Sequence, residues 1–321
     1  MIRLLLGGFL SLVFVGNFPL PAWAQLPVVS MSSFDKPSIG HTIASLIEAN
    51  GFDKKNGVDI QWVFKESRAA NTDFATGRDK ITLASALLSE ANRRLQGIKS
   101  VVLFNAMNLH GALLTSDPRI RSLKDLDGKT VAANTVTTNY AMFRYFAMKA
   151  GVDLKKLQVQ SATTAGLAAL LLAKRADAVH VWEPQYSQIL YENPGRFTMI
   201  EYVHQWDAIH GRPQRGYLTV TAHEDWIAGN RELIPRIYKA FKDMAAWLPG
   251  HYEQAAGMIA DATGIPPGAI LMALMANRYP ADVVPAANIK ESIQVIFRAG
   301  VESGYMKSLP DEGIIYTGLK E

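Results

Sequence analysis

The sequence predicts an α/β protein made of two consecutive βαβ-rich units and a helical C-terminal part. Apolar β-rich runs alternate with segments whose apolar residues recur at the period of a helix, and the alternation starts again after Asp127-Gly128. This pattern is typical of α/β proteins with parallel sheets. No stretch rich in Gly, Ser and Pro separates the units, so we expect packed lobes.

The first unit contains four predicted strands, at residues 26–30, 58–64, 80–84 and 101–104. Its first helix begins at Pro37-Ser38 and ends at Gly51. Helical spacing places one apolar stripe on that helix, formed by Ile39, Ile43, Leu46 and Ile47. The unit therefore reads as strand, helix and three further strands.

The second unit repeats this order. Predicted strands lie at residues 129–133, 157–160 and 176–181, and a second helix at 165–174. The first helix follows the polar loop 134–138, turns Phe143, Phe146, Ala147 and Ala150 inward, and ends at Gly151. From Glu224 onward we expect mostly helices, because residues 234–248 and 289–300 each carry one continuous apolar face.

Composition excludes several classes of protein. A chain of 321 residues with 49% hydrophobic and 19% charged residues has enough apolar surface to bury a core. The absence of cysteine excludes disulfide scaffolds, thiolate metal sites and cysteine nucleophiles. A net charge of +4, carried by scattered basic pairs without a polybasic run, gives no indication of a nucleic-acid partner.

Residues 1–24 have the pattern of a secretory signal peptide. Arg3 supplies the positive end, residues 4–15 are apolar except for one Ser, and Ala22-Trp23-Ala24 is a small-x-small cleavage site. The apolar run is too short to span a bilayer core of about 30 Å. We therefore expect cleavage after Ala24 and export to the periplasm.

Motifs for enzymatic chemistry are incomplete in this sequence. Gly128-Lys129-Thr130 resembles the end of a P-loop, but Leu123 stands where the first glycine is required. His223-Glu224 opens like a zinc-protease helix, but Ile227 replaces the second histidine ligand. The serine-hydrolase and dinucleotide fingerprints are also absent from the sequence, so we expect no catalytic residues, no cofactor and no metal.

Two segments resemble a family of bacterial proteins. Residues 122–132, SLKDLDGKTVA, resemble the entry to the second lobe of ABC-transporter substrate-binding proteins. Residues 177–184, DAVHVWEP, resemble the D-A-x-x-x-W-E-P turn of the nitrate/sulfonate/taurine family, which includes binders of thiamine pyrimidines. The likeness covers about residues 26–248, and the C-terminal helices fit by type alone.

This resemblance implies a type II periplasmic-binding fold with two lobes, a hinge and a ligand cleft between the lobes. Lobe 1 would comprise residues 25–114 plus 217–321, and lobe 2 residues 115–216. The protein would capture a small polar organic solute or an anion, of the sulfonate, nitrate or aminopyrimidine type. It would deliver that ligand as a monomer to an ABC permease and its ATPase.

In lobe 2, polar residues follow the ends of two predicted strands, where ligands bind in open α/β sheets. They are Thr135, Thr137, Thr138 and Asn139 at a helix start, and Trp182 and Glu183 after the strand 176–181. A helix start offers free backbone N–H groups to an anion or a carbonyl. The alternatives are plain N-capping by Thr138 or Asn139, and a Glu183 carboxylate that ties down loop amides.

In lobe 1, the same topology nominates residues that follow three predicted strands. They are Phe34, Ser38, Ala84, Ser85 and Asn105. Arg68 and Arg215 are the guanidiniums available for bidentate binding of a sulfonate or carboxylate, although a surface ion pair is the alternative for both.

Two other functions remain open at this point. One is an enzyme on the same fold, but the pyrimidine-precursor synthases and deaminases that share it depend on cysteines, which this sequence lacks. The other is a periplasmic sensor domain, which the sequence does not distinguish from a transport receptor.

Overall fold

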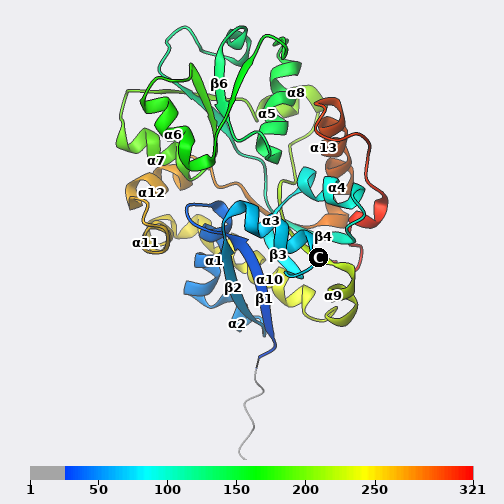
Figure 1. The fold of residues 1–321 in the computed structure, drawn as a ribbon. Coiled ribbons are helices and arrows are strands. Elements are labelled where there is room, and N and C mark those ends of the chain that lie inside the picture. The colour runs from blue at the N-terminus through cyan, green and yellow to red at the C-terminus, as the bar shows by residue number, and fades with distance from the viewer. Residues whose placement is uncertain (1–25, 321) are drawn as a thin grey trace, which may run out of the picture.

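Two separate mixed β-sheets, each covered by helices, organise the part of the chain that the structure describes (Figure 1). The structure is a computed structural model that describes residues 26–320. The predicted signal peptide, residues 1–24, lies outside the described residues. We call the six-stranded sheet with its helices lobe 1, and the five-stranded sheet with its helices lobe 2.

The sheet of lobe 1 has the strand order β11-β4-β10-β3-β1-β2. Its strands are β1 (Val28–Phe34), β2 (Asp59–Lys65), β3 (Ile81–Ala86), β4 (Ser100–Met107), β10 (Leu218–His223) and β11 (Ala281–Pro285). The sheet of lobe 2 has the order β7-β6-β8-β5-β9. Its strands are β5 (Ala112–Thr115), β6 (Thr130–Ala133), β7 (Gln158–Ser161), β8 (Ala178–Val181) and β9 (Thr198–Glu201).

Predicted parallel strands lie side by side in each sheet, and antiparallel strands are added where the chain crosses between the lobes. β10 is antiparallel to both β3 and β4, and β5 is antiparallel to both β8 and β9. Each of these two strands enters its sheet directly after a crossing, from the side that faces the other lobe. It therefore runs opposite to the strands that end on that side.

Helices cover both lobes. In lobe 1 they are α1 (Ile39–Asn50), α2 (Phe52–Lys55), α3 (Ser67–Ala75), α4 (Leu87–Leu95), α9 (Glu224–Gly229), α10 (Ile234–Trp247), α11 (Tyr252–Thr263), α12 (Pro267–Met275) and α13 (Lys290–Glu302). In lobe 2 they are α5 (Thr138–Lys149), α6 (Thr164–Leu172), α7 (Gln185–Glu192) and α8 (Gln205–His210). The C-terminal part is mostly helical as predicted, but it also contributes the antiparallel strand β11. Within residues 26–320, no helix combines the length and the apolar character needed to cross a bilayer.

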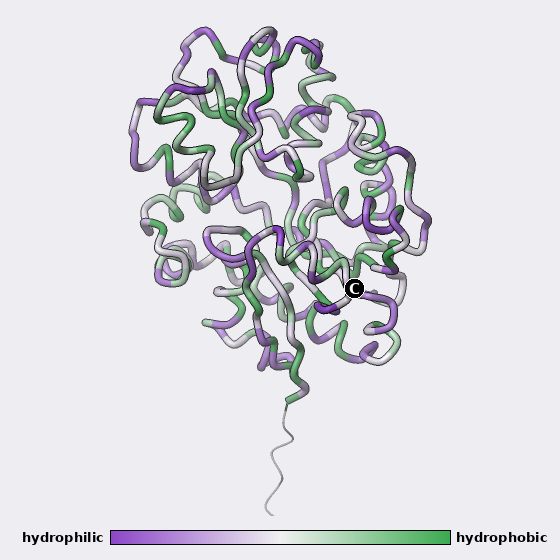
Figure 2. The backbone as a smooth tube through the Cα atoms, in the orientation of Figure 1, coloured by the Kyte–Doolittle hydropathy of each residue, from purple (hydrophilic) through white to green (hydrophobic). Residues whose placement is uncertain are grey.

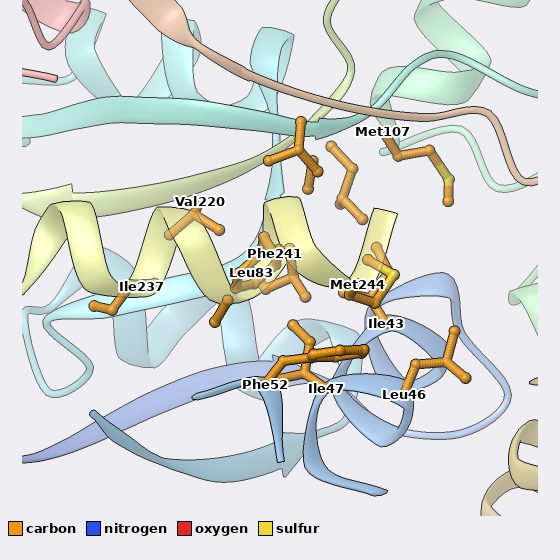
Figure 3. Close-up of a cluster of buried hydrophobic side chains, with 14 of the residues drawn as sticks. Ile43, Leu46, Ile47, Phe52, Leu83, Met107, Val220, Ile237, Phe241 and Met244 are labelled. Carbon is orange, nitrogen blue, oxygen red and sulfur yellow. The ribbon is translucent and has the colours of Figure 1, made fainter. Parts of the chain in front are cut away.

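The core of lobe 1 lies between the sheet and helices α1 and α10. α10 turns Ile237, Phe241 and Met244 inward, as its predicted apolar face requires (Figure 3). The Phe241 ring meets Phe104 of β4 edge to face, with 5.2 Å between the ring centroids. Figure 2 shows the same division along the backbone, with hydrophilic segments in the outer loops and hydrophobic segments in the strands.

Buried amides hold the two crossing segments, residues 108–111 and 211–217, side by side. The Asn105 amide nitrogen donates to Asn108 Oδ1 at 3.1 Å, and its Oδ1 accepts from the Tyr217 backbone N–H at 3.0 Å. The Leu109 N–H donates to Gln214 Oε1 at 2.9 Å. Because these bonds join outgoing and returning chain, they fix the position at which the lobes meet.

We predict that Phe241→Ala lowers the free energy of unfolding by about 3–5 kcal/mol, because it removes a fully buried aromatic ring from a close-packed core. Urea denaturation measures the change. Leu309→Ala, which truncates a side chain that is 49% exposed, serves as the control and should change stability by less than about 0.5 kcal/mol. Equal losses in the two variants would contradict this description of the core.

Candidate interlobe binding site

The carboxyl ends of the main parallel strands of each lobe face the other lobe. β1, β2 and β3 are mutually parallel, and β4 shares their direction because both β3 and β4 are antiparallel to β10. In lobe 2, β6 and β8 are parallel neighbours. The crossing leaves lobe 1 at the end of β4, so the loops that follow these strands meet between the lobes. The segments 134–138 and 182–184 therefore lie on one edge of the lobe 2 sheet.

One pair of facing loops consists of the β1–α1 loop and the β8–α7 loop. Tyr279, which lies between α12 and β11, joins them: its hydroxyl is close to Thr42 of α1 and to the Glu183 carboxyl. Tyr279 is 5% exposed although it lies between two lobes. On this side α12 also packs against α7 of lobe 2 (Figure 1).

A second pair consists of the first turn of α4, which directly follows β3, and the start of α5 after the β6–α5 loop. The Thr138 hydroxyl oxygen, at the start of α5, accepts the Ser89 backbone N–H at 3.2 Å and lies 3.0 Å from the Ser89 hydroxyl. α4 has no side-chain cap of its own at Ala86. A residue of lobe 2 therefore caps a helix of lobe 1.

The structure divides the predicted threonine cluster into distinct roles. Thr135 shares a hydrogen bond of 2.9 Å with Ser161 of β7, and both side chains lie on lobe 2. Thr137 is the N-cap of α5 and accepts the Tyr140 N–H at 3.2 Å. Thr138 makes the interlobe contact. The N-capping alternative had named Thr138 or Asn139, whereas the N-cap in the structure is Thr137. Asn139 is 2% exposed and lies beside the Tyr217 hydroxyl.

Trp182 and Glu183 follow β8 as predicted, but they differ in exposure. Trp182 is half-buried and contacts the His180 ring. Glu183 is fully buried and accepts the backbone N–H of Ser187 at 3.3 Å as well as the Ser187 hydroxyl. Burial raises the pKa of this carboxyl to about 7 despite these bonds. Glu183 therefore ties down the first turn of α7, which was the structural alternative for this residue.

The predicted residues of lobe 1 lie at the edge that faces lobe 2, with their polar groups largely engaged. Ser38 caps α1 by accepting the His41 N–H at 3.0 Å and donates to the Phe34 carbonyl at 2.9 Å. Ala84 and Ser85 are buried in β3, and the Ser85 hydroxyl donates to the buried carboxyl of Glu90 on α4. Asn105 belongs to the hinge network described above. Phe34 remains half-buried at the end of β1.

The two predicted arginines differ in their surroundings. Arg68 is exposed in the first turn of α3. Arg215 forms a bidentate pair with Asp282 of β11, with N···O distances of 2.8 and 2.6 Å. An ion pair was the stated alternative for Arg215, and the Asp282 carboxylate occupies two N–H groups of its guanidinium.

Sequence reasoning missed three residues of the cleft, which are His110, Arg278 and Tyr279. The His110 ring packs edge to face on Tyr217, with 5.6 Å between centroids. The Arg278 guanidinium donates to the Ser187 hydroxyl at 3.3 Å and lies 3.8 Å from the Glu201 carboxylate. Only His110 gave a signal, because it stands in the segment that follows β4. Arg278 and Tyr279 come from a C-terminal part that the sequence related to the site by helix type alone.

Charges near the cleft are largely paired. Lys65, at the end of β2, contacts Asp73 and Asp79 at 2.8 and 2.7 Å. Arg278 lies near the Glu183 and Glu201 carboxyl groups. Across residues 26–320, no group of three His, Asp or Glu side chains is placed to hold a metal ion.

Comparison with known proteins places the chain in a family. A family model described as NMT1/THI5 like matches residues 38–255, so the chain belongs to the NMT1/THI5-like family. No curated protein matches the sequence.

Solved structures share the fold. The alkanesulfonate-binding protein SsuA from Xanthomonas axonopodis pv. citri, bound to MOPS, is 14% identical with a TM-score of 0.72, over 91% of this chain and 97% of that chain. The aliphatic sulphonate-binding protein SsuA from Escherichia coli is 16% identical with a TM-score of 0.71, over 89% and 96%. The ligand-binding component of an ABC-type import system from Staphylococcus aureus, with zinc bound, is 9% identical with a TM-score of 0.67, over 90% and 96%. The predicted type II periplasmic-binding fold is confirmed.

We predict that Glu183→Gln makes the free energy of unfolding less dependent on pH. The unfolded-state carboxyl loses its proton near pH 4.5, whereas the folded-state carboxyl keeps it to about pH 7. The contribution of protonated Glu183 to the free energy of unfolding is therefore complete below pH 4.5, and it is lost as the pH rises to about 7. At 1.36 kcal/mol for each pH unit, the free energy of unfolding of the wild-type protein should fall by about 3 kcal/mol relative to Glu183→Gln.

Urea denaturation between these pH values measures this difference. Glu192→Gln, an exposed carboxyl on the same helix, is the control and should leave the pH profile unchanged. Parallel profiles for the wild-type protein and Glu183→Gln would show that burial does not shift this group.

We predict that Thr138→Val and Ser89→Ala are coupled across the cleft by about 0.5–1 kcal/mol in a double-mutant cycle, because each removes one partner of the same interlobe hydrogen bond. Thr137→Val, which removes the neighbouring N-cap, should combine additively with Ser89→Ala. Additive effects of Thr138→Val and Ser89→Ala would rule out a contact between the lobes at this point.

Proposed function

We propose that this protein is the periplasmic substrate-binding component of an ABC importer. It captures a small polar organic solute or an anion between its lobes and delivers it, as a monomer, to a permease with its ATPase. The observation that carries the proposal is the pair of loop contacts between the lobes, located where ligands bind in open α/β sheets. Closure of two domains around a ligand is a known transition of this architecture.

Family membership and the structural neighbours support this proposal. The two SsuA proteins are described as binding alkanesulfonates or aliphatic sulphonates, and their sequence identity of 14–16% relates the fold alone. The N-terminal signal pattern of residues 1–24 accords with a periplasmic location. Sulfonate, nitrate and aminopyrimidine compounds are therefore the first ligand classes to test.

The predicted contacts that we retain for the ligand lie in or next to a loop at the cleft edge. They are Phe34, Ser38, Thr135, Thr137, Thr138 and Trp182. Trp182 is the strongest of them. It is half-buried at the end of β8, and an indole there offers a flat apolar face to a planar or alkyl ligand.

We predict that a true ligand raises thermal stability through binding to the folded state, by about 2.7 kcal/mol at a hundredfold excess over Kd, which gives a rise of several degrees in Tm. Thermal shift against sulfonates, nitrate and aminopyrimidines measures it. Trp182→Ala should reduce the shift. Trp226→Ala, which truncates a half-buried tryptophan on α9, should not.

Native mass spectrometry of protein purified without added ligand extends the search to solutes outside this panel. The absence of any binder in both experiments would contradict the proposal. Chemical turnover of a bound solute would favour an enzyme instead.

A further inference from the structure

The strand β7 forms an open edge of the lobe 2 sheet. It pairs with β6 on one side, and no strand within residues 26–320 pairs with it on the other. All four of its residues are exposed. The edge strands β2, β9 and β11 each contain a charged residue, which discourages pairing with another chain, whereas β7 has the uncharged sequence QVQS. An edge without such a residue is suited to accept a further strand.

The free backbone groups of this edge belong to Val159 and Ser161. The N–H groups of Gln158 and Ala162 each donate at 3.0 Å to a carbonyl group on the β6 side. Because the backbone groups of successive strand residues point to opposite sides, those of Val159 and Ser161 point away from β6. An added strand would therefore bond to β7 through these two residues.

A groove runs beside this edge, between β7 and α6, and has a volume of about 410 Å³. Gln160 and Ser161 line it on the β7 side, and Ala169, Leu170 and Ala173 line it on the α6 side. The outer face of a surface helix is normally polar, but every residue of α6 after its first threonine is glycine or apolar. The groove therefore has one apolar wall and one wall that offers hydrogen bonds. We call it the β7 groove.

The end of the β7 groove that lies away from the interlobe cleft is basic. Arg175 lines the groove at this end, and Lys174 and Lys155 are exposed in the loops that precede β8 and β7. None of the three side chains has an ion-pair partner among the residues that the structure describes. The carboxyl groups of Asp153 and Asp177 at this edge are engaged by a neighbouring lysine and by a backbone N–H. Charge complementarity therefore favours an occupant that is negative here.

The direction of β7 determines how such an occupant would lie. The basic end of the groove corresponds to the start of β7, because the parallel strands of lobe 2 end at the cleft. A strand antiparallel to β7 would place its own C-terminal end beside Arg175, whereas a parallel strand would place its N-terminal end there. Alternate side chains of the antiparallel strand would face α6 and pack on Ala169 and Leu170.

We propose that the β7 groove binds the acidic C-terminal segment of a partner protein, which adds an antiparallel strand to β7 and places its terminal carboxylate at Arg175. In this mode of recognition, backbone hydrogen bonds give affinity and pockets for alternate side chains give specificity. A guanidinium can bind a carboxylate through two parallel N–H···O bonds. The groove lies on the outer edge of lobe 2, so the inference does not rest on the proposed function.

The first test identifies occupants without assuming their sequence. A phage-displayed library of random seven-residue peptides with free C-termini is selected on the full chain. We expect enrichment of peptides that end in Asp or Glu and carry an apolar residue at every second position before the end. The absence of enrichment, or enrichment of peptides without these features, would overturn the inference.

The second test measures binding of the most enriched peptide by fluorescence anisotropy. Val159→Pro removes an N–H that points away from β6, so it should change Tm little but weaken binding at least about tenfold. Arg175→Glu reverses the charge in the groove and Ala169→Arg fills it, so both should weaken binding to a similar extent. Arg231→Glu and Ala246→Arg make the same changes at exposed positions of lobe 1, and these controls should leave binding unchanged.

Binding that stays within twofold of the wild-type value in all three groove variants would overturn the inference. So would equal affinity for the peptide with an amidated C-terminus, because the carboxylate would then contribute nothing. Sedimentation velocity tests a second copy of the chain as the occupant. Self-association that Val159→Pro abolishes would show that the edge of β7 serves that copy, and the proposal of an acidic partner segment would be wrong.

Discussion

The arrangement depends on one constraint, which is that the chain leaves lobe 1 and returns to it through adjacent strands. β10 enters the larger sheet between β3 and β4, so the outgoing and returning segments lie side by side. Asn108 Oδ1 accepts from the Gly216 N–H at 2.9 Å as well as from Asn105, which binds the two crossings together. Gly216 has a φ of +102°, and a Cβ there would lie 2.9 Å from Leu87 Cδ1. These bonds hold the outgoing and returning segments together, so the two sets of loops stay opposite each other.

The lobes are also joined by an apolar contact beside the crossings. Leu87 of α4, Met142 of α5 and Ile296 of α13 belong to one buried cluster that spans both lobes. With Leu109 and Tyr217 they line a narrow crevice that has no room for a water molecule. Apolar packing therefore holds the lobes together near the hinge, whereas the facing loops carry the polar contacts. Rotation that separates the loops must also expose part of this cluster.

The fold could be predicted wherever local pattern decides structure. The apolar stripe of Ile39, Ile43, Leu46 and Ile47 identified α1, and the helix start near Thr138 was correct within one residue. β5, β9 and β11 escaped prediction, although they are no shorter than β6, β7 and β8, which the sequence analysis located. The sheet directions were missed because β10 owes its orientation to the crossing, and a strand's sequence does not record the direction from which it enters a sheet.

The site could be predicted at the level of loops, but not at the level of atoms. Strand ends located the Trp182 and Thr138 loops correctly, because topology decides where parallel strands end. The Ser85 hydroxyl is engaged by Glu90, and the Arg215 fork by Asp282. Such pairings join residues far apart in the chain or on different elements, so residue type gave no sign of them. Tyr279 was missed for the same reason, since its neighbours Thr42 and Glu183 are far from it in the sequence.

Glu183 shows how this cleft accommodates a buried carboxyl group. The buried Glu183 carboxyl accepts its hydrogen bonds from Ser187, which belongs to the same lobe. These bonds hold α7 in place whether or not a ligand occupies the cleft. Under the proposed function, a ligand that contacts both lobes binds the closed state more tightly than the open one. Recognition and closure then become the same free-energy term.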